Sequence, residues 1–212
     1  MHKFLLFLSI LLLTFNSFSQ VVLPLKERVS AIEDIQKDRL ENLLPKLMKR
    51  EKIDCWVIIT REYNEDPIIK SLLPPTWLNA RRRTILVFTL NESSNKVDMA
   101  AITRYSFGNL IKSVWDKEKE PNQMKALVDY LLLKSPKKIG INISKIYGIA
   151  DGLSVTDNNL LMSYLPKSLK TKVVSAEPLA VSWIETRTEK EMTLFYHLTE
   201  INQNIIKRTY ST

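Results

Sequence analysis

The segment "DCWVIITREYNEDP" (Asp54–Pro67) holds a strand and the loop that follows it, and it decides the fold class. Its residues 55–59 are all apolar, and a short unbroken apolar run of this kind is typical of a strand buried on both faces. Such strands occur mainly in α/β proteins, where helices cover both sides of a sheet. The segment therefore predicts an α/β domain with an interior strand at residues 54–60.

The rest of the chain alternates between strand and helix patterns. "RTILVFTL" (83–90) and "KVDMAAITRY" (96–105) flank the turn "NESSN" (91–95), which predicts an antiparallel hairpin. Further strands are predicted at 137–144 and 171–179. Helices are predicted at 30–53, with a kink or division at Pro45, at 120–136, within 152–169 with Thr156 or Asp157 as N-cap, and from Glu189 onward. The order predicts a mixed sheet of about five to six strands with helices on both faces, plus a long C-terminal helix.

The first nineteen residues have the layout of a secretory signal peptide. A positive start, "MHK", precedes the run Phe4–Phe15, which is apolar apart from Ser9 and Thr14, and small residues follow at Ser17 and Ser19. The run is shorter than the roughly 20 residues that a membrane-spanning helix needs. We therefore expect cleavage near Ser19, export to the periplasm or the extracellular space, and no permanent membrane span.

Composition and motifs exclude several classes of function for this chain. The 212 residues are 45% hydrophobic and 25% charged, as in a globular protein, and carry a formal charge of +8. The densest basic cluster, Arg81–Arg83, comes without any nucleic-acid-binding motif, so no nucleic-acid partner is predicted. Phosphate-binding glycine loops and H-E-x-x-H are missing, and the two histidines are His2 and His197. No catalytic, cofactor-binding or metal-binding residue is therefore predicted in this chain.

The loop "REYNEDP" after the first buried strand is the most function-like local feature. Functional loops often follow the strands of an α/β sheet. Arg61, Tyr63, Asn64 and Asp66, together with Arg82, are possible substrate-facing or interface-facing residues. The alternative, which we favour, is an Asx-type turn that leads into a helix at Pro67.

Three segments, in this order along the chain, resemble a known family. They are "REYNEDP", "ARRRTILVF" (80–88) and "SAEPLAVSWIETRTEKEM" (175–192). Together they resemble the N-terminal domain of the creatinase, prolidase and Xaa-Pro aminopeptidase family of metallopeptidases, over about residues 38–212. Before the last helix, the residues that match the family pattern are Arg187, Thr188, Glu189 and Glu191.

The resemblance implies a non-catalytic domain. In that family the N-terminal domain packs beside a catalytic domain, takes part in dimerisation and helps to cover the active site. The catalytic domain binds two divalent metal ions (manganese, cobalt or zinc), and none of their ligands has a counterpart here. The expected divisions are a signal peptide at 1–19, an extension at 20–37, the family-like domain at 38–184, and a linker with the first helix of a truncated catalytic domain at 185–212.

The expected partners follow from the same resemblance. They are the catalytic domain of the same family or a second copy in a homodimer, with proline-containing peptides bound only together with the catalytic domain. The chain alone is expected to be inactive. The main alternative is a stand-alone exported module that binds a peptide or a protein. A hydrolase that uses Cys55 or acidic residues is a third, weaker hypothesis, because Cys55 lies in a predicted core strand.

The last helix has a clear start and an apolar stripe. Thr188 and Glu191 have the spacing of a capping box. Leu194, Leu198, Ile201 and Ile205 form the stripe, which Phe195 and Ile206 widen. Such a stripe needs a partner surface. We therefore expect the part from about Ile201 onward to be loosely held or sticky.

Overall fold

The computed structural model describes residues 23–211, which fold around a single six-stranded mixed sheet. The strand order is β4-β3-β2-β1-β5-β6. The strands are β1 (Cys55–Arg61), β2 (Arg83–Asn91), β3 (Lys96–Ala101), β4 (Lys112–Ser113), β5 (Ile139–Ile141) and β6 (Val173–Ser175). β2 pairs antiparallel with both of its neighbours, whereas β3–β4, β1–β5 and β5–β6 are parallel pairs. The predicted mixed sheet and its hairpin are confirmed.

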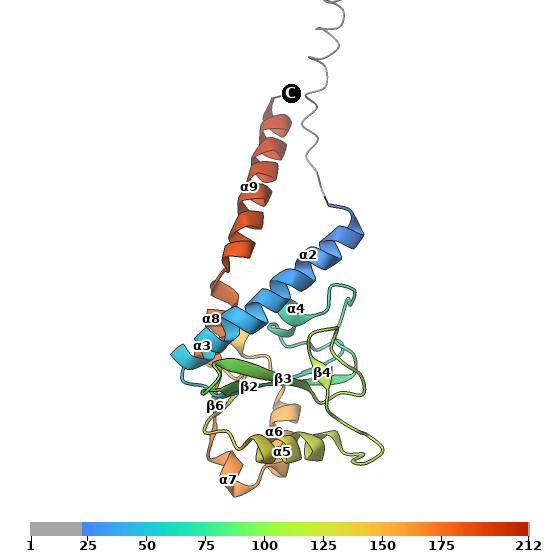
Figure 1. Ribbon diagram of the computed structural model, residues 1–212, viewed down its shortest axis with the longest axis vertical. Helices are drawn as coiled ribbons and strands as arrows, with labels where there is room; N and C mark the ends of the chain where they lie inside the picture. The colour runs from blue at the N-terminus through green and yellow to red at the C-terminus, as the bar shows by residue number, and fades with distance from the viewer. Residues whose placement is uncertain (1–22, 212) are drawn as a thin grey trace, which may run out of the picture.

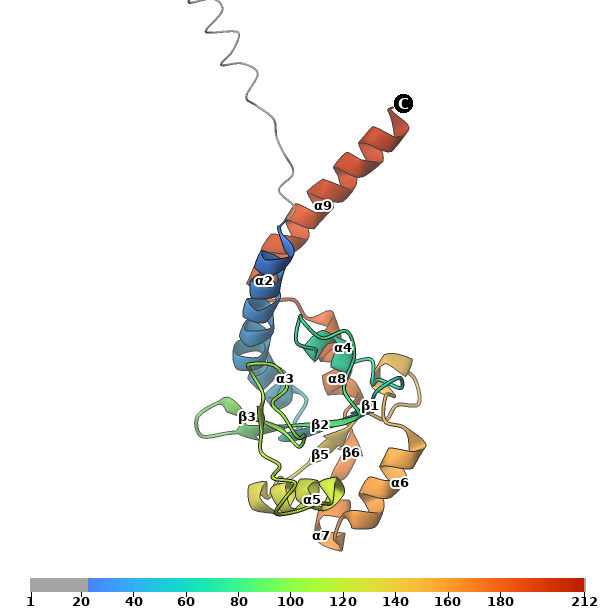
Figure 2. The same cartoon turned by 90° about the vertical axis from the view of Figure 1, so that its right-hand side faces the viewer.

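Helices cover both faces of this sheet, as predicted (Figure 1). On one side lie α2 (Leu25–Asp38), the π-helical turn η1 (Arg39–Leu43), α3 (Leu44–Arg50), α4 (Ile69–Leu72) and α8 (Glu177–Glu185). On the other side lie α5 (Gln123–Lys134), α6 (Val155–Tyr164) and α7 (Lys167–Lys170). The 3-10 turn η2 (Gly148–Ala150) follows β5, and the long helix α9 (Glu189–Tyr210) extends away from the sheet (Figures 1 and 2).

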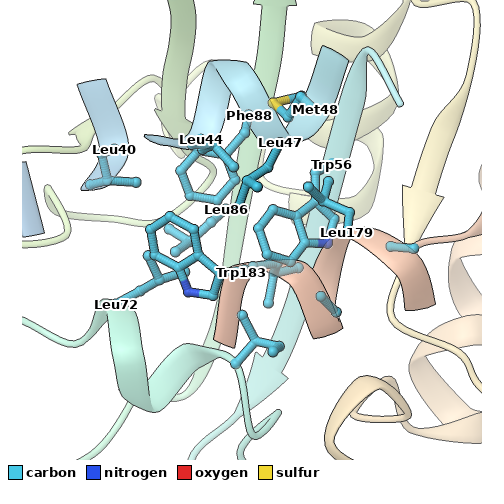
Figure 3. Close-up of a cluster of buried hydrophobic side chains, with 14 of the residues drawn as sticks. Leu40, Leu44, Leu47, Met48, Trp56, Leu72, Leu86, Phe88, Leu179 and Trp183 are labelled. Carbon is cyan, nitrogen blue, oxygen red and sulfur yellow. The ribbon is translucent and has the colours of Figure 1, made fainter. Parts of the chain in front are cut away.

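Two hydrophobic clusters hold the layers together, one on each face of the sheet. In β1, Trp56 and Ile58 point to one face and Val57 and Ile59 to the other, as the period of a strand requires. Figure 3 shows the first cluster, in which Trp56, Leu86 and Phe88 of the sheet meet side chains of α3 and α8. The second cluster joins the sheet to Leu127 and Leu131 of α5 and Leu161 of α6. The prediction that the first strand is buried on both faces is confirmed.

Pro45 divides the first helical region, as predicted. It lies in the first turn of α3, directly after the π-helical turn η1. Proline has no backbone N–H, and its ring crowds the carbonyl group four residues earlier. A widened π turn before the proline accommodates both effects while the chain stays helical.

Two element assignments from the sequence are wrong. The sequence predicts a strand over 171–179, but β6 ends at Ser175 and α8 begins at Glu177. Pro178 explains the switch, because its fixed φ and missing N–H suit the first turn of a helix. The N-cap of α6 is neither Thr156 nor Asp157: Ser154 Oγ accepts a hydrogen bond from the Asp157 N–H at 3.2 Å.

The predicted signal peptide, residues 1–19, lies outside the described residues. The predicted extension at 20–37 overlaps α2, whose Gln36 side chain donates a hydrogen bond to the Leu73 carbonyl at 2.6 Å. Within residues 23–211, no helix is both long and apolar enough to cross a membrane. The domain boundaries remain predictions.

Candidate functional site

The loop after β1 turns sharply and exposes part of the predicted site. The Asn64 N–H donates to the Arg61 carbonyl at 3.0 Å, and Tyr63 between them has a left-handed backbone with φ of 66°. This turn leaves the Tyr63 side chain 87% exposed. The Glu62 N–H donates to the Arg82 carbonyl at 2.7 Å, which ties this loop to the one before β2. Tyr63, Asn64 and Arg82 are therefore exposed residues of two neighbouring loops.

Asp66, a further predicted site residue, points into the protein instead. Its Oδ1 accepts a hydrogen bond from the Ile68 N–H at 2.8 Å, which is the predicted Asx-type turn. Its Oδ2 accepts from Asn142 Nδ2 at 2.8 Å, and Asn142 Oδ1 in turn accepts from Trp56 Nε1 at 2.7 Å. All three side chains are buried. The network joins the loop after β1 to the residue that follows β5.

Burial dominates the electrostatics of Asp66. It raises the pKa of this carboxyl group to about 6, while the hydrogen bonds from Asn142 and Ile68 act in the opposite direction. No ion pair links Asp66 to a basic side chain within residues 23–211. The backbone at Gly152 passes so close that an added Cβ would lie 2.2 Å from Asp66 Cγ. Asp66 thus fits a position that organises the loops at the carboxyl ends of β1 and β5.

Arg61 is held by Asp157, an acid that the sequence pattern does not place in the site. Its Nε and Nη2 donate to Asp157 Oδ2 and Oδ1 at 2.7 and 2.8 Å, a bidentate arrangement. Arg83 Nε lies 3.1 Å from Asp157 Oδ1, without the alignment of a hydrogen bond. The hydrogen bond to Asp157 raises the pKa of Arg61. Arg61 therefore fixes α6 to the end of β1. Of the predicted site residues, Tyr63, Asn64 and Arg82 remain exposed.

The first arginine of the basic cluster also has a structural partner. The Arg81 guanidinium lies 4.2 Å from the centre of the Trp77 ring and 5.5 Å from that of Tyr105. A cation over an aromatic face at these distances is attracted to the ring. The Trp77 ring in turn meets Phe107 edge-on at 5.2 Å between centroids. Arg81 and Arg83 therefore each have a side-chain partner within the fold, whereas Arg82 contacts Glu62 through its backbone.

Cys55 has the surroundings of a core residue. Its side chain is fully buried in β1, and burial raises the pKa of its thiol to about 12. Because the thiolate is the nucleophilic form, this thiol is unreactive at neutral pH. Within the described part of the chain, no group of three or more His, Cys, Asp or Glu residues is placed to hold a metal ion.

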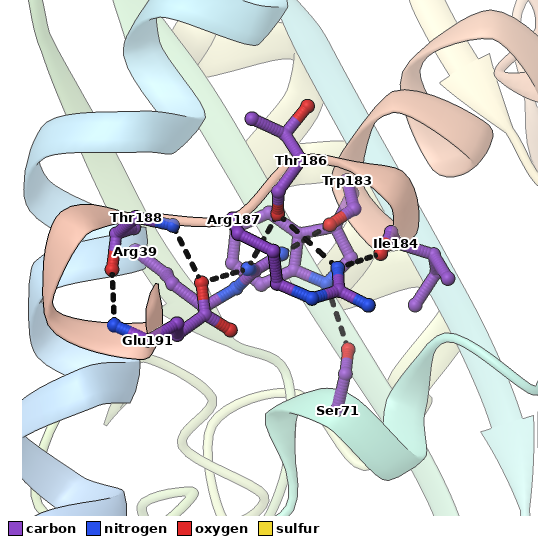
Figure 4. A network of polar contacts seen from close by, with 8 residues as sticks. All are labelled: Arg39, Ser71, Trp183, Ile184, Thr186, Arg187, Thr188 and Glu191. Carbon is purple, nitrogen blue, oxygen red and sulfur yellow. Dashed lines mark hydrogen bonds and ion pairs between the residues drawn. The ribbon is translucent and has the colours of Figure 1, made fainter. Parts of the chain in front are cut away.

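The junction between α8 and α9 is built around Arg39 (Figure 4). Arg39 Nη1 donates to the Thr186 carbonyl at 2.9 Å and to Glu191 Oε2 at 2.7 Å, and Nη2 donates to the Trp183 carbonyl. The Arg39 guanidinium also lies 4.2 Å from the centre of the Trp183 ring. One nearly buried cation therefore ties η1 to the end of α8 and to the start of α9.

The predicted capping box at the start of α9 is confirmed. Thr188 Oγ1 accepts from the Glu191 N–H at 3.3 Å, and Glu191 Oε2 accepts from the Thr188 N–H at 2.8 Å. The same Glu191 oxygen accepts from Arg39. The direction in which α9 leaves the domain is thus fixed by the cap and by Arg39 together.

Beyond this junction, α9 is uncovered. It has 22 residues and none of them is buried; Leu198 and Ile205 are 61% and 55% exposed. Figures 1 and 2 show the helix standing clear of the sheet and of its covering helices. At its base, a cavity of about 540 Å³ opens between α2, the loop after α4 and the α8–α9 junction, with Ile32, Ile35 and Ile184 in its wall. The uncovered apolar face of α9, with the cavity at its base, is the second candidate site.

Comparisons with protein-family models, with curated proteins and with solved structures find no match for this chain. The candidate sites are therefore interpreted from their own geometry and from the resemblance of the three sequence segments.

Proposed function

We propose that this chain is a non-catalytic docking domain of an exported Xaa-Pro aminopeptidase-like metallopeptidase. Its roles are to pack beside the catalytic domain, to take part in dimerisation and to help cover the active site. Proline-containing peptides bind only together with that catalytic domain, which also holds the two divalent metal ions. The domain alone has no peptidase activity.

The observation that carries this proposal is the state of α9. A helix with a complete capping box and a nearly buried arginine at its base is well anchored, yet it has no buried residue along 22 positions. In proteins, most of the stability of an amphipathic helix comes from packing of its apolar face against another surface. The mixed sheet with helices on both faces also supports the proposal, because the family resemblance implies that architecture.

Two experiments test this function. Purified protein supplied with manganese should not cleave an Xaa-Pro peptide, and cleavage would contradict the claim of a non-catalytic domain. The second is to read the nucleotide sequence downstream of the codon for Thr212. A frame that encodes aspartate, histidine and glutamate ligands of a metallopeptidase, in the same or a neighbouring gene, is the expected result.

A stand-alone module that binds a peptide or a protein is the alternative, and the loop after β1 favours it. Tyr63 is held almost fully exposed in a left-handed conformation that non-glycine residues adopt uncommonly. If this loop binds a peptide, the tyrosine fluorescence and the amide resonances of residues 62–65 should respond to a mixture of short peptides. Unchanged loop resonances would leave the docking function as the better proposal.

A further inference from the structure

Another cavity, of about 530 Å³, lies at the amino-terminal end of β1, away from the loop that carries Tyr63. It is bordered by the end of α3, the start of β1, the turn between β2 and β3, and the segment that leads into β5. Neither α9 nor the loop after β1 borders it. The proposed function therefore gives this cavity no role.

Hydrogen bonds between neighbouring strands hold one side of this cavity in place. The Leu90 N–H donates to the Asp54 carbonyl at 2.8 Å, and the Cys55 N–H donates to the Lys138 carbonyl at 3.1 Å. The Asp54 carboxylate accepts from the N–H groups of Lys137 and Lys138 at 2.7 and 2.6 Å. These bonds fix the backbone that carries Leu90 and Lys138, so this part of the cavity is formed before any ligand binds.

The buried residues that line the cavity form an apolar floor. Met48 and Ile53 are 0% and 3% exposed and belong to the first hydrophobic cluster, and the half-buried Leu90 packs against the same cluster. A floor of this kind offers a surface to a compact apolar group of a ligand.

The rim of the cavity is basic. Four lysines and two carboxylates line it, which leaves a net formal charge of +2. Lys137 is already paired, because its Nζ donates to both carboxylate oxygens of Glu92 at 3.0 and 3.1 Å. Within residues 23–211, the ammonium groups of Lys49, Lys52 and Lys138 belong to no ion pair. Three unpaired cations thus border the apolar floor.

Lys52 occupies a position where glycine is the usual residue. The Ile53 N–H donates to the Met48 carbonyl at 3.0 Å and the Lys52 N–H donates to the Lys49 carbonyl at 3.3 Å, which is the pattern of a Schellman motif at the end of α3. Lys52 has the left-handed backbone of this motif, with φ of 56°, a conformation that glycine adopts without strain. Lysine is thus less favourable than glycine for the turn itself, and it adds a cation to the cavity.

We infer that this cavity binds a phosphate monoester that carries a compact apolar group. Such an ester has a charge of about −1.5 to −2 near pH 7, which matches the net charge of the lining better than the single charge of a carboxylate does. Lysine binds phosphate as a point charge, whereas arginine is the residue that suits bidentate recognition of a carboxylate. Within the described residues, no arginine lines this cavity. The phosphate lies at the three unpaired lysines and the apolar group lies on the floor.

Titration of the purified protein with phenyl phosphate, followed through its amide resonances, tests the inference. We expect saturable shifts at the end of α3, at Leu90 and at Lys138. Inorganic phosphate should bind roughly tenfold more weakly, because it leaves the apolar floor uncovered. Equal binding of the two compounds, or no saturable shift around the cavity, would overturn the inference.

Two variants show whether binding depends on the lysines of the rim. Lys52→Gly removes a cation and places glycine at the left-handed position, so it should weaken phenyl phosphate binding roughly tenfold without lowering the denaturation midpoint. Lys138→Gln should weaken binding to a similar extent. Lys167→Gln is the matched control, because Lys167 is an exposed residue of α7 that belongs to no ion pair within residues 23–211. If Lys52→Gly and Lys138→Gln bind as the wild type does, the inference is overturned, and Lys52 only complements the carboxyl end of α3.

A second arm of the experiment distinguishes a soluble ester from a lipid with the same chemistry. Vesicles that contain phosphatidic acid present a phosphate monoester above an apolar phase, and phosphatidylcholine vesicles are their control. Cosedimentation with phosphatidic acid vesicles that Lys52→Gly abolishes would assign the ligand to a lipid. Binding of phenyl phosphate without cosedimentation would assign it to a soluble ester, and binding of neither would overturn the inference.

Discussion

At the scale of single residues, Asp66 is the group whose surroundings have the clearest consequence. Both of its carboxylate oxygens accept hydrogen bonds from N–H donors, which favours the ionised form, but the side chain is fully buried. Burial prevails and holds the pKa near 6, above the ordinary value of 3.8. The folded protein therefore binds this proton more tightly than the unfolded chain does.

This difference predicts a dependence of stability on pH. The contribution of Asp66 to the free energy of unfolding is fully present below about pH 4 and is lost as the pH rises through about 6. The size of the effect is about 3 kcal/mol. Denaturant titrations between pH 4 and 7.5 should show this slope in the wild type, and Asp66→Asn should flatten it. An equal slope in both proteins would assign the titration to other carboxyl groups.

Gly152 lies directly against the Asp66 carboxyl group, where the backbone leaves no space for a side chain. A methyl group at Gly152 would meet the buried Asp66 carboxyl carbon at 2.2 Å, and hydrogen bonds from Ile68 and Asn142 hold that carboxyl group in place. Gly152→Ala should therefore destabilise the fold by about 1–3 kcal/mol or more, as overpacking of a core does. Gly148→Ala is the matched control, because nothing lies within 4 Å of its added Cβ. Equal denaturation midpoints for the two variants would contradict this reading of the Asp66 site.

At the scale of elements, the start of α9 depends on one hydroxyl group. Thr188→Ala removes the acceptor for the Glu191 N–H and should cost about 1 kcal/mol of helix stability. The loss should appear as faster amide exchange in the first turn of α9. Thr193→Ala is the control within the same helix, because its hydroxyl only bonds back to the Glu189 carbonyl. If the two variants exchange alike, the cap does not hold the helix start.

Which elements could be predicted from the sequence depends on how local their causes are. The apolar run of β1, the turn between β2 and β3, the Asx turn at Asp66 and the capping box at Thr188 each depend on a few neighbouring residues, and all are confirmed. The start of α8 is also marked locally, by Pro178, whereas the predicted strand runs through this proline to Leu179. A proline suits the first turn of a helix, where its missing N–H has no partner to lose, better than the interior of a strand.

The candidate sites were harder to predict because their contacts join distant segments. The sequence predicts Arg61 as a possible substrate-facing or interface-facing residue, but its partner Asp157 lies 96 positions away on α6. The Arg39 contacts with Trp183 and Glu191 span 144 and 152 positions. No local pattern encodes such pairs, since they exist only once the sheet order has brought the segments together. The sequence did indicate where polar groups gather, but not which of them face solvent.

At the scale of the whole molecule, the stability of α9 should depend on what covers it. Nothing in residues 23–211 buries its C-terminal half, so a monomer should exchange its amide hydrogens rapidly from Ile201 to Tyr210, while β1 and β2 exchange slowly. Raising the protein concentration should protect the same stretch if a second copy covers the apolar face of α9, because association stabilises only the bound form. Leu198→Glu should remove the concentration dependence and leave the exchange of the sheet unchanged. Strong protection across Ile201 to Tyr210 in a dilute monomer would mean that the helix is stable without a partner, and the main reason for regarding α9 as a docking element would be lost.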